Sequence, residues 1–248
     1  MTSTIVAKPA TRQDWLDRSR GLAIILMVIF HACFDLTTFH FASFDFTNDF
    51  WRAFRTLIIV LFFGISGWTA TLGHDRPIPW RRFSKRFLQV AMAAILISLV
   101  TGFLFPQRWI YFGILHFFAV SMWVALPFRG RPYWALTVGI ALFVMDATLS
   151  NFNFSWLFQA LQPVLHLPNS TLDIARFTPW FGVVLIGIFL GHVVPEDRVA
   201  AIFSAGFSAK KTPRFDLLLW TGRHPLSVYL IHQPILYGLT AIADALLH

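Results

Sequence analysis

Two ionisable residues stand one helical turn apart inside an apolar stretch, His31 and Asp35 in HACFD. Residues at i and i+4 lie on the same face of a helix. A carboxylate beside an imidazole can fix its tautomer and raise its basicity, which suits a general base that removes a proton from a hydroxyl or an amine. A hydrogen bond between packed helices is the structural alternative, and the pair alone does not decide between them.

Two further histidines lie in apolar segments, His116 in FGILHFF and His232 in YLIHQPI. An ionisable side chain at membrane depth costs at least ~2.5 kcal/mol, so each should face a partner or a polar cavity. Together with His31, these two histidines lie at three different depths of the membrane, so the three could line a polar route across it. A single histidine in such a position more often only makes a hydrogen bond between helices.

The loops carry polar groups of two kinds. One kind is basic and could hold the phosphates of a nucleotide-like donor: the run Arg81, Arg82, Lys85 and Arg86, with Arg223 and His224. Anionic lipid headgroups are the commoner partners of such a run. The other kind is a mixed set of acidic and basic groups in the loops on the other side of the membrane. It could bind a hydroxylated or amino-bearing acceptor: His40, Asp45, Asp49, Arg52, His166, Asp173 and Arg176.

The elements that position these residues are apolar. The 248 residues are 56% hydrophobic and 13% charged, where a soluble chain has roughly 25% charged residues. We therefore predict an all-α, polytopic transmembrane helix bundle forming one domain over residues 1–248. One cysteine excludes an internal disulfide and a cysteine-based metal cluster. No Walker A, GxGxxG, GxSxG or HExxH pattern supports another enzyme class.

The sequence has seven apolar windows long enough to cross a ~30 Å hydrocarbon core as helices. An eighth stretch, 152–167, is short and contains Pro163, so we interpret it as interfacial or re-entrant, with an eighth span as the alternative. The seven windows are 21–38, 54–73, 87–105, 110–127, 133–149, 178–195 and 225–247.

Charge predicts the orientation. Sixteen of the 20 Lys and Arg fall in segments on one side of the predicted spans, and four on the other: Arg52, Arg55, Arg108 and Arg176. The positive-inside rule then places the N-terminus in the cytoplasm and, for seven spans, the C-terminus outside. The net charge of +8 thus reflects topology, and we expect no nucleic-acid partner. We also expect span 1 to be retained rather than cleaved as a signal peptide.

Five segments together resemble the heparan-alpha-glucosaminide N-acetyltransferase catalytic-domain family, in its short bacterial branch within the transmembrane acyltransferase group. They occur in the family's order along nearly the whole chain. They are DRSRGLAIILMVIFHACFDL at 17–36, FFGISGW at 62–68, YFGILHFFAVSM at 111–122, TLDIARFTPWFGVVLIGIFLG at 171–191 and GRHPLSVYLIHQPIL at 222–236.

The resemblance implies an integral protein of the bacterial cytoplasmic membrane that moves an acetyl group from cytosolic acetyl-CoA to an amine or hydroxyl of a sugar-type acceptor outside. Acetyl-CoA is then a donor substrate, and no metal or prosthetic group is expected. The catalytic candidates are His31, Asp35, His40, His116 and His232, with the base open between His31 and His40. The donor-binding candidates are Arg81, Arg82, Arg86 and Arg223.

Two other classes of function stay open. A transporter or flippase would use the intramembrane His and Asp residues to bind substrate or relay protons. A non-catalytic membrane subunit would use them only as packing contacts. The expected partners are a sugar or glycan acceptor and membrane lipids, and a homodimer is left open.

Overall fold

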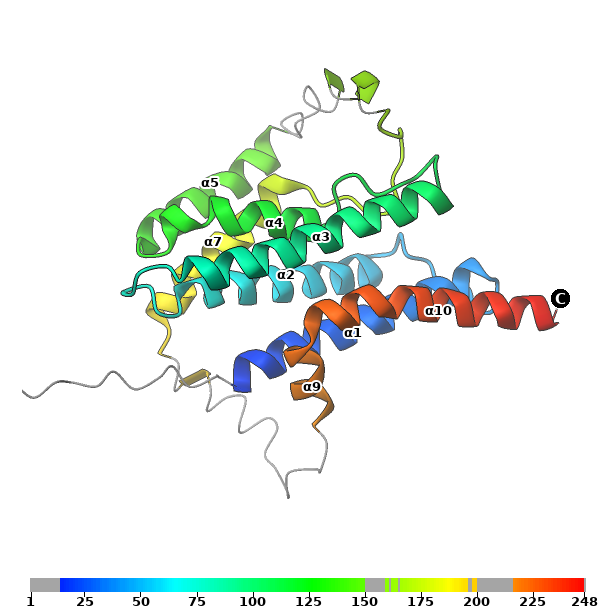
Figure 1. Ribbon diagram of the computed structural model, residues 1–248, viewed down its shortest axis with the longest axis horizontal. Helices are drawn as coiled ribbons and strands as arrows, with labels where there is room; N and C mark the ends of the chain where they lie inside the picture. Colours follow the sequence, from blue (N-terminus) through cyan, green and yellow to red (C-terminus); the bar gives the residue numbers. More distant parts are fainter. Residues whose placement is uncertain are drawn as a thin grey trace, which may run out of the picture.

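The computed structural model describes residues 14–149, 159–160, 162–164, 166–195, 198–199 and 216–247, and over these ranges it has helices and no strand. An α-helix lies in each of the seven predicted windows (Figure 1). These helices are α1 (Asp14–Thr38), α2 (Asp49–Thr71), α3 (Trp80–Leu104), α4 (Ile114–Val124), α5 (Pro132–Thr148), α7 (Phe177–Val193) and α10 (Pro225–Leu247). A short helix that the windows do not predict, α9 (Leu217–Arg223), precedes α10. Most of the 152–167 stretch lies outside the described residues.

Within the described ranges, four helices are long and apolar enough to cross a membrane: α1, α2, α3 and α10. Helices α5 and α7 are apolar but have 17 residues each, and α4 has 11. At 1.5 Å per residue, 17 residues span roughly 25 Å, which is short of a ~30 Å core. The structure therefore supports a polytopic membrane protein, but it confirms neither the count of seven spans nor the cytoplasmic N-terminus.

The helix starts follow from local sequence. Asn48 precedes α2 and its side chain accepts a hydrogen bond from the Trp51 N–H at 3.0 Å. Asp216 precedes α9 and accepts one from the Leu219 N–H at 3.0 Å. Both satisfy amide donors that a helix leaves unpaired in its first turn.

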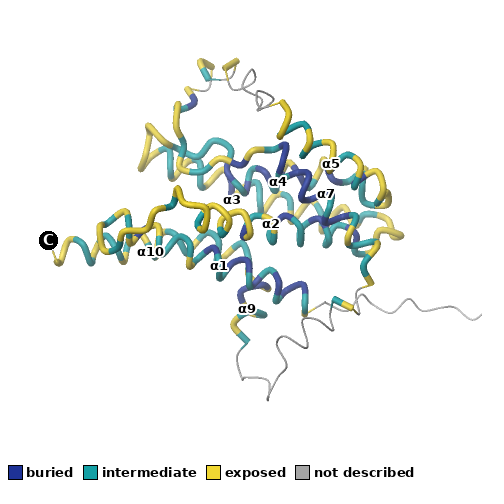
Figure 2. Tube along the Cα trace, turned by 180° about the vertical axis from the view of Figure 1, so that it is seen from behind, coloured by how far each residue is buried: buried dark blue, intermediate teal, exposed yellow. Residues whose placement is uncertain are grey.

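Helix α7 is the most buried element, with nine buried residues, and it packs between α2 and α5 (Figure 2). Glycines allow this close approach. A Cβ on Gly187 would overlap the backbone of Gly64 in α2, and one on Gly182 would lie 3.0 Å from the Gly139 carbonyl oxygen in α5. Phe63, Phe117 and Leu185 fill the core around these contacts.

Helices α1 and α10 run side by side in the same direction, away from α9 (Figure 1). Gly21 of α1 and Gly222 of α9 let the two backbones touch. Further along, Asp35 of α1 meets Gln233 of α10. This parallel pairing brings the His31 and His232 segments of the sequence together.

Helix α4 begins later than the predicted window, at Ile114 rather than near residue 110. The preceding segment is not helical, and it is held by another irregular segment: the Leu172 N–H donates to the Arg108 carbonyl at 2.9 Å, and the Ala175 N–H to the Phe112 carbonyl at 3.0 Å. Hydrophobicity alone did not distinguish this stretch from a helix. Irregular backbone at membrane depth is tolerated where protein satisfies its polar groups, as these bonds do.

Candidate active site

His31 of α1 and His232 of α10 lie edge to face, with ring centroids 5.0 Å apart. Each ring is held by the backbone of its own helix. His31 Nδ1 lies 2.9 Å from the Met27 carbonyl oxygen, and His232 Nδ1 lies 2.7 Å from the Tyr229 carbonyl oxygen. A carbonyl only accepts hydrogen bonds, so each Nδ1 carries the proton. In the neutral rings both Nε2 atoms therefore hold a lone pair and are available as acceptors or bases.

Asp35 is buried, with 1% of its surface exposed, and its carboxylate accepts two hydrogen bonds from Gln233 Nε2, at 3.0 and 3.2 Å. The sequence suggested that Asp35 fixes the tautomer of His31. In the structure the Met27 carbonyl does so instead, and Asp35 is a buried carboxylate one turn from His31.

Two buried acceptors of this cluster have no hydrogen-bond partner among the described residues, His232 Nε2 and Gln233 Oε1. The orientation of the Gln233 side-chain amide follows from chemistry, because its NH₂ group is the donor and must face the ionised carboxylate of Asp35. Unpaired buried acceptors are costly and call for a donor. An amine or a hydroxyl on a ligand would supply one.

His116 lies in the first turn of α4. Its Nε2 is 3.1 Å from the hydroxyl oxygen of Ser98 in α3, and its Nδ1 accepts from the Gly113 N–H at 3.3 Å. Tyr229, one turn before His232, packs against two apolar clusters, one between α1 and α2 and the other between α3 and α4. His116 is thus bound to the α3–α4 pair, and Tyr229 links that pair to the two-histidine contact.

Asp173 lies in the irregular segment before α7 and accepts a hydrogen bond from the Ile114 N–H at 3.0 Å, so it caps α4 from outside the helix. Burial raises the pKa of Asp173 above its ordinary value of 3.8, although this hydrogen bond and the charges of His31 and Arg55 act in the opposite direction. The carboxylate therefore lies within the electrostatic reach of the candidate base.

His40 lies apart from this cluster. It is exposed, two residues beyond the end of α1, and adopts a positive φ of 62°. Its backbone N–H donates to the Thr37 carbonyl at 3.2 Å. Seven residues of helix separate His31 from the end of α1, roughly 10 Å along the axis. Of the two candidates for the base, His31 is the one that meets other polar side chains of the cluster.

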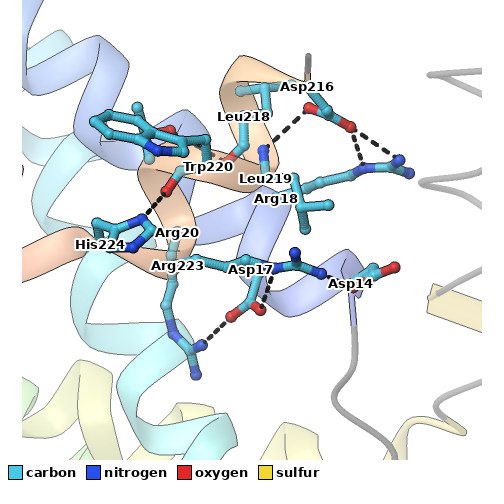
Figure 3. Close-up of polar contacts among 11 residues, drawn as sticks. Asp14, Asp17, Arg18, Arg20, Asp216, Leu218, Leu219, Trp220, Arg223 and His224 are labelled. Carbon is cyan, nitrogen blue, oxygen red and sulfur yellow. Dashed lines mark hydrogen bonds and ion pairs between the residues drawn. The ribbon is translucent and has the colours of Figure 1, made fainter. Parts of the chain in front are cut away.

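The donor-binding candidates fall in two places. Arg81, Arg82 and Arg86 are exposed in the first turns of α3. Arg223 of α9 instead pairs with Asp14 at 3.1 Å and with the buried Asp17 at 3.8 Å (Figure 3). Neighbouring pairs in the same network are Arg20 with Asp17 at 2.7 Å and Arg18 with Asp216 at 3.0 Å. This network ties α9 to α1 and neutralises Arg223.

Sequence reasoning missed Gln233 and Tyr229 as members of the site, although both stand beside His232 in YLIHQP. It also missed a second imidazole pair, His74 and His192, whose ring centroids are 4.5 Å apart at the ends of α2 and α7. His192 Nδ1 lies 2.9 Å from the Ile188 carbonyl oxygen, the same local arrangement as in His31. Among the described residues, no three His, Cys, Asp or Glu side chains gather as a metal site.

The family model described as "Heparan-alpha-glucosaminide N-acetyltransferase, catalytic" matches residues 12–234. The match includes α1 through α7 and the part of α10 that carries His232 and Gln233. The chain belongs to this family. The resemblance that five sequence segments predicted is thereby confirmed, and the family supports a membrane acetyltransferase. No curated protein and no solved structure matches the chain.

Proposed function

We propose that this protein is a membrane-embedded acyltransferase that moves an acetyl group from cytosolic acetyl-CoA to an amine or hydroxyl of a sugar-type acceptor on the extracytoplasmic side. One observation carries the proposal: two imidazoles with Nδ1 fixed by backbone carbonyls meet beside a buried carboxylate, and His232 Nε2 has no partner among the described residues. Family membership supports the reaction class.

In the proposed reaction, His31 Nε2 removes the proton of the acceptor amine or hydroxyl while that atom attacks the thioester carbonyl carbon. A new C–N or C–O bond forms, the C–S bond breaks, and the proton moves from His31 to the CoA thiolate. Asp35, one turn away, stabilises the transient imidazolium. His232 Nε2 and Gln233 Oε1 accept hydrogen bonds from the acceptor and orient it.

His116 is placed differently, because Ser98 and the Gly113 amide already contact both of its ring nitrogens. We assign it to positioning of the thioester arm from the α3–α4 side. This direct transfer needs no covalent acyl-enzyme, so Cys33 has no role in it.

The test is release of free CoA from acetyl-CoA by the purified full chain in proteoliposomes, with and without a panel of amino sugars and sugar alcohols. We expect release that depends on the acceptor, and acetylated acceptor in equal amount. No release with any acceptor, together with acceptor-driven flux of a sugar or protons across the vesicle, would overturn the proposal in favour of a transporter.

A further inference from the structure

At one end of the α3–α4 pair, two tryptophan rings lie nearly parallel on the surface. Trp80, the first residue of α3, and Trp123, in the last turn of α4, have ring centroids 6.1 Å apart and an interplanar angle of 30°. They are 53% and 44% exposed. Large aromatic faces left open in this way are suited to stacking with another flat ring.

Phenylalanine rings of α3 pack against both exposed indoles and hold them in place. Phe83 and Phe87 of α3 meet the Trp123 ring edge to face, with centroids 4.9 and 5.6 Å away. Phe83 also meets Trp80 at 5.7 Å. Since α3 and α4 both contribute to the pair, the spacing of the two indoles is set by helix packing rather than by a loop.

The first turns of α3, which begin with Trp80, are strongly basic. Arg81, Arg82 and Lys85 are exposed in the first turns of α3, which contain no acidic residue. No carboxylate of the described residues pairs with these three, in contrast to the neutralised Arg223 network. Unpaired cations next to an aromatic face fit a ligand that combines phosphates with a base.

We propose that Trp80 and Trp123 form a stacking site for the adenine ring of the acyl-CoA donor, with Arg81, Arg82 and Lys85 on its phosphates. The inference rests on the proposed function, whose donor it localises. The same helix pair carries the Ser98–His116 contact further along. A nucleotide bound at Trp80 and Trp123 therefore directs the thioester arm along the α3–α4 seam toward the histidines.

The experiment compares two probes, CoA and phosphopantetheine, which lacks the nucleotide, in equilibrium binding to the full chain in phosphatidylcholine nanodiscs. We expect W80L and W123L each to weaken CoA binding roughly 5- to 150-fold, the range that base stacking on an aromatic side chain supplies. Phosphopantetheine binding should not change. W80F should retain most of the CoA affinity, because it keeps an aromatic face.

Trp134 provides the matched control. It is 66% exposed in the first turn of α5, three residues after the basic Arg131, so it shares the features of an interfacial tryptophan. We expect W134L to bind CoA as the wild type does. Equal loss in W134L and W80L, or no loss in W80L and W123L, would overturn the stacking site.

Two other outcomes would show whether the error lies in the proposed donor or in the ligand assigned to this surface. If the wild type binds neither probe, the acetyl-CoA donor of the proposed function is wrong as well. If W80L and W123L bind CoA normally but retain less phosphatidylglycerol than the wild type in nanodiscs that contain this lipid, the surface is a lipid-headgroup site and the nucleotide assignment is wrong. The melting temperature of each variant shows that it is folded.

Discussion

At the scale of residues, the site differs from the one that spacing alone suggests. His31 and Asp35 share a helix face, but they do not bond to each other: His31 Nδ1–H donates to the Met27 carbonyl, and the Asp35 carboxylate accepts from Gln233. Asp35 is thus held by α10 rather than by its own helix. In the proposed reaction it acts on His31 through charge, and its position depends on Gln233.

The Asp35–Gln233 contact gives the first prediction. Gln233→Leu leaves a buried carboxylate without its donor, so we expect the free energy of unfolding to fall by about 2 kcal/mol. Replacing both residues with Leu should cost less than the sum of the two single changes, because no polar group is then left unpaired. Thermal melting in detergent measures all three variants, and strict additivity would contradict the contact.

Asp173 gives a prediction about pH. Its pKa is raised in the folded state, so the folded protein binds this proton more tightly than the unfolded one. Stability due to this group is therefore lost as the pH rises from its ordinary pKa of 3.8 through the raised pKa. The melting temperature of the wild type relative to Asp173→Asn should fall across that window and then level off. A relative rise with pH would contradict the raised pKa.

Sequence could identify the histidines and Asp35, because ionisable groups are conspicuous in apolar segments. It could not show which of them meet. Helical periodicity gives the face of each helix, but not the order of the helices around the bundle, and the α1–α10 pairing depends on that order. Gln233, Tyr229 and Asp173 join the site through tertiary contacts. The catalytic roles of all these residues stay predictions.

At the scale of elements, long apolar windows predicted the helices well, because burial in lipid requires continuous apolar stretches. The start of α4 and the short helix α9 were not predicted. Residues 110–113 are as apolar as a helix, yet the backbone of this stretch and of the two residues before it bonds elsewhere. The Ile110 N–H donates to the Thr101 hydroxyl, and carbonyls of residues 108, 109 and 112 accept from residues 172, 171 and 175. Helix α9 is set by the Asp216 cap and by its ion pairs to α1.

Helix packing gives the third prediction. Gly187→Ala would push a methyl group into the Gly64 backbone, so we expect a loss of about 1 to 3 kcal/mol in the free energy of unfolding. Gly238→Ala in α10 meets nothing within 4 Å and should be neutral or stabilising, since alanine favours a helix. Comparable melting temperatures for the two variants would show that α2 and α7 do not touch closely.

At the scale of the whole molecule, family membership and the arrangement of charges fit one direction of transfer. The exposed arginines of α3 lie in the first turns of that helix, and the histidine contact lies well along α1 and α10. Under the proposed function, with the inner end assigned by the positive-inside rule, we expect the donor to enter from the cytoplasm and the acceptor from outside. The central claim is that the His31–His232 pair performs the transfer between them.

The most direct test compares acetyl transfer by His31→Gln, His40→Gln and His192→Gln at matched melting temperatures. His192 has the same Nδ1 contact to a backbone carbonyl as His31 but lies beside His74, outside the site, so it controls for structure. We expect His31→Gln to lose roughly 10²- to 10⁴-fold in rate, the range of general base catalysis, and the other two to stay near the wild type. Full activity in His31→Gln, or an equal loss in His192→Gln, would contradict the account.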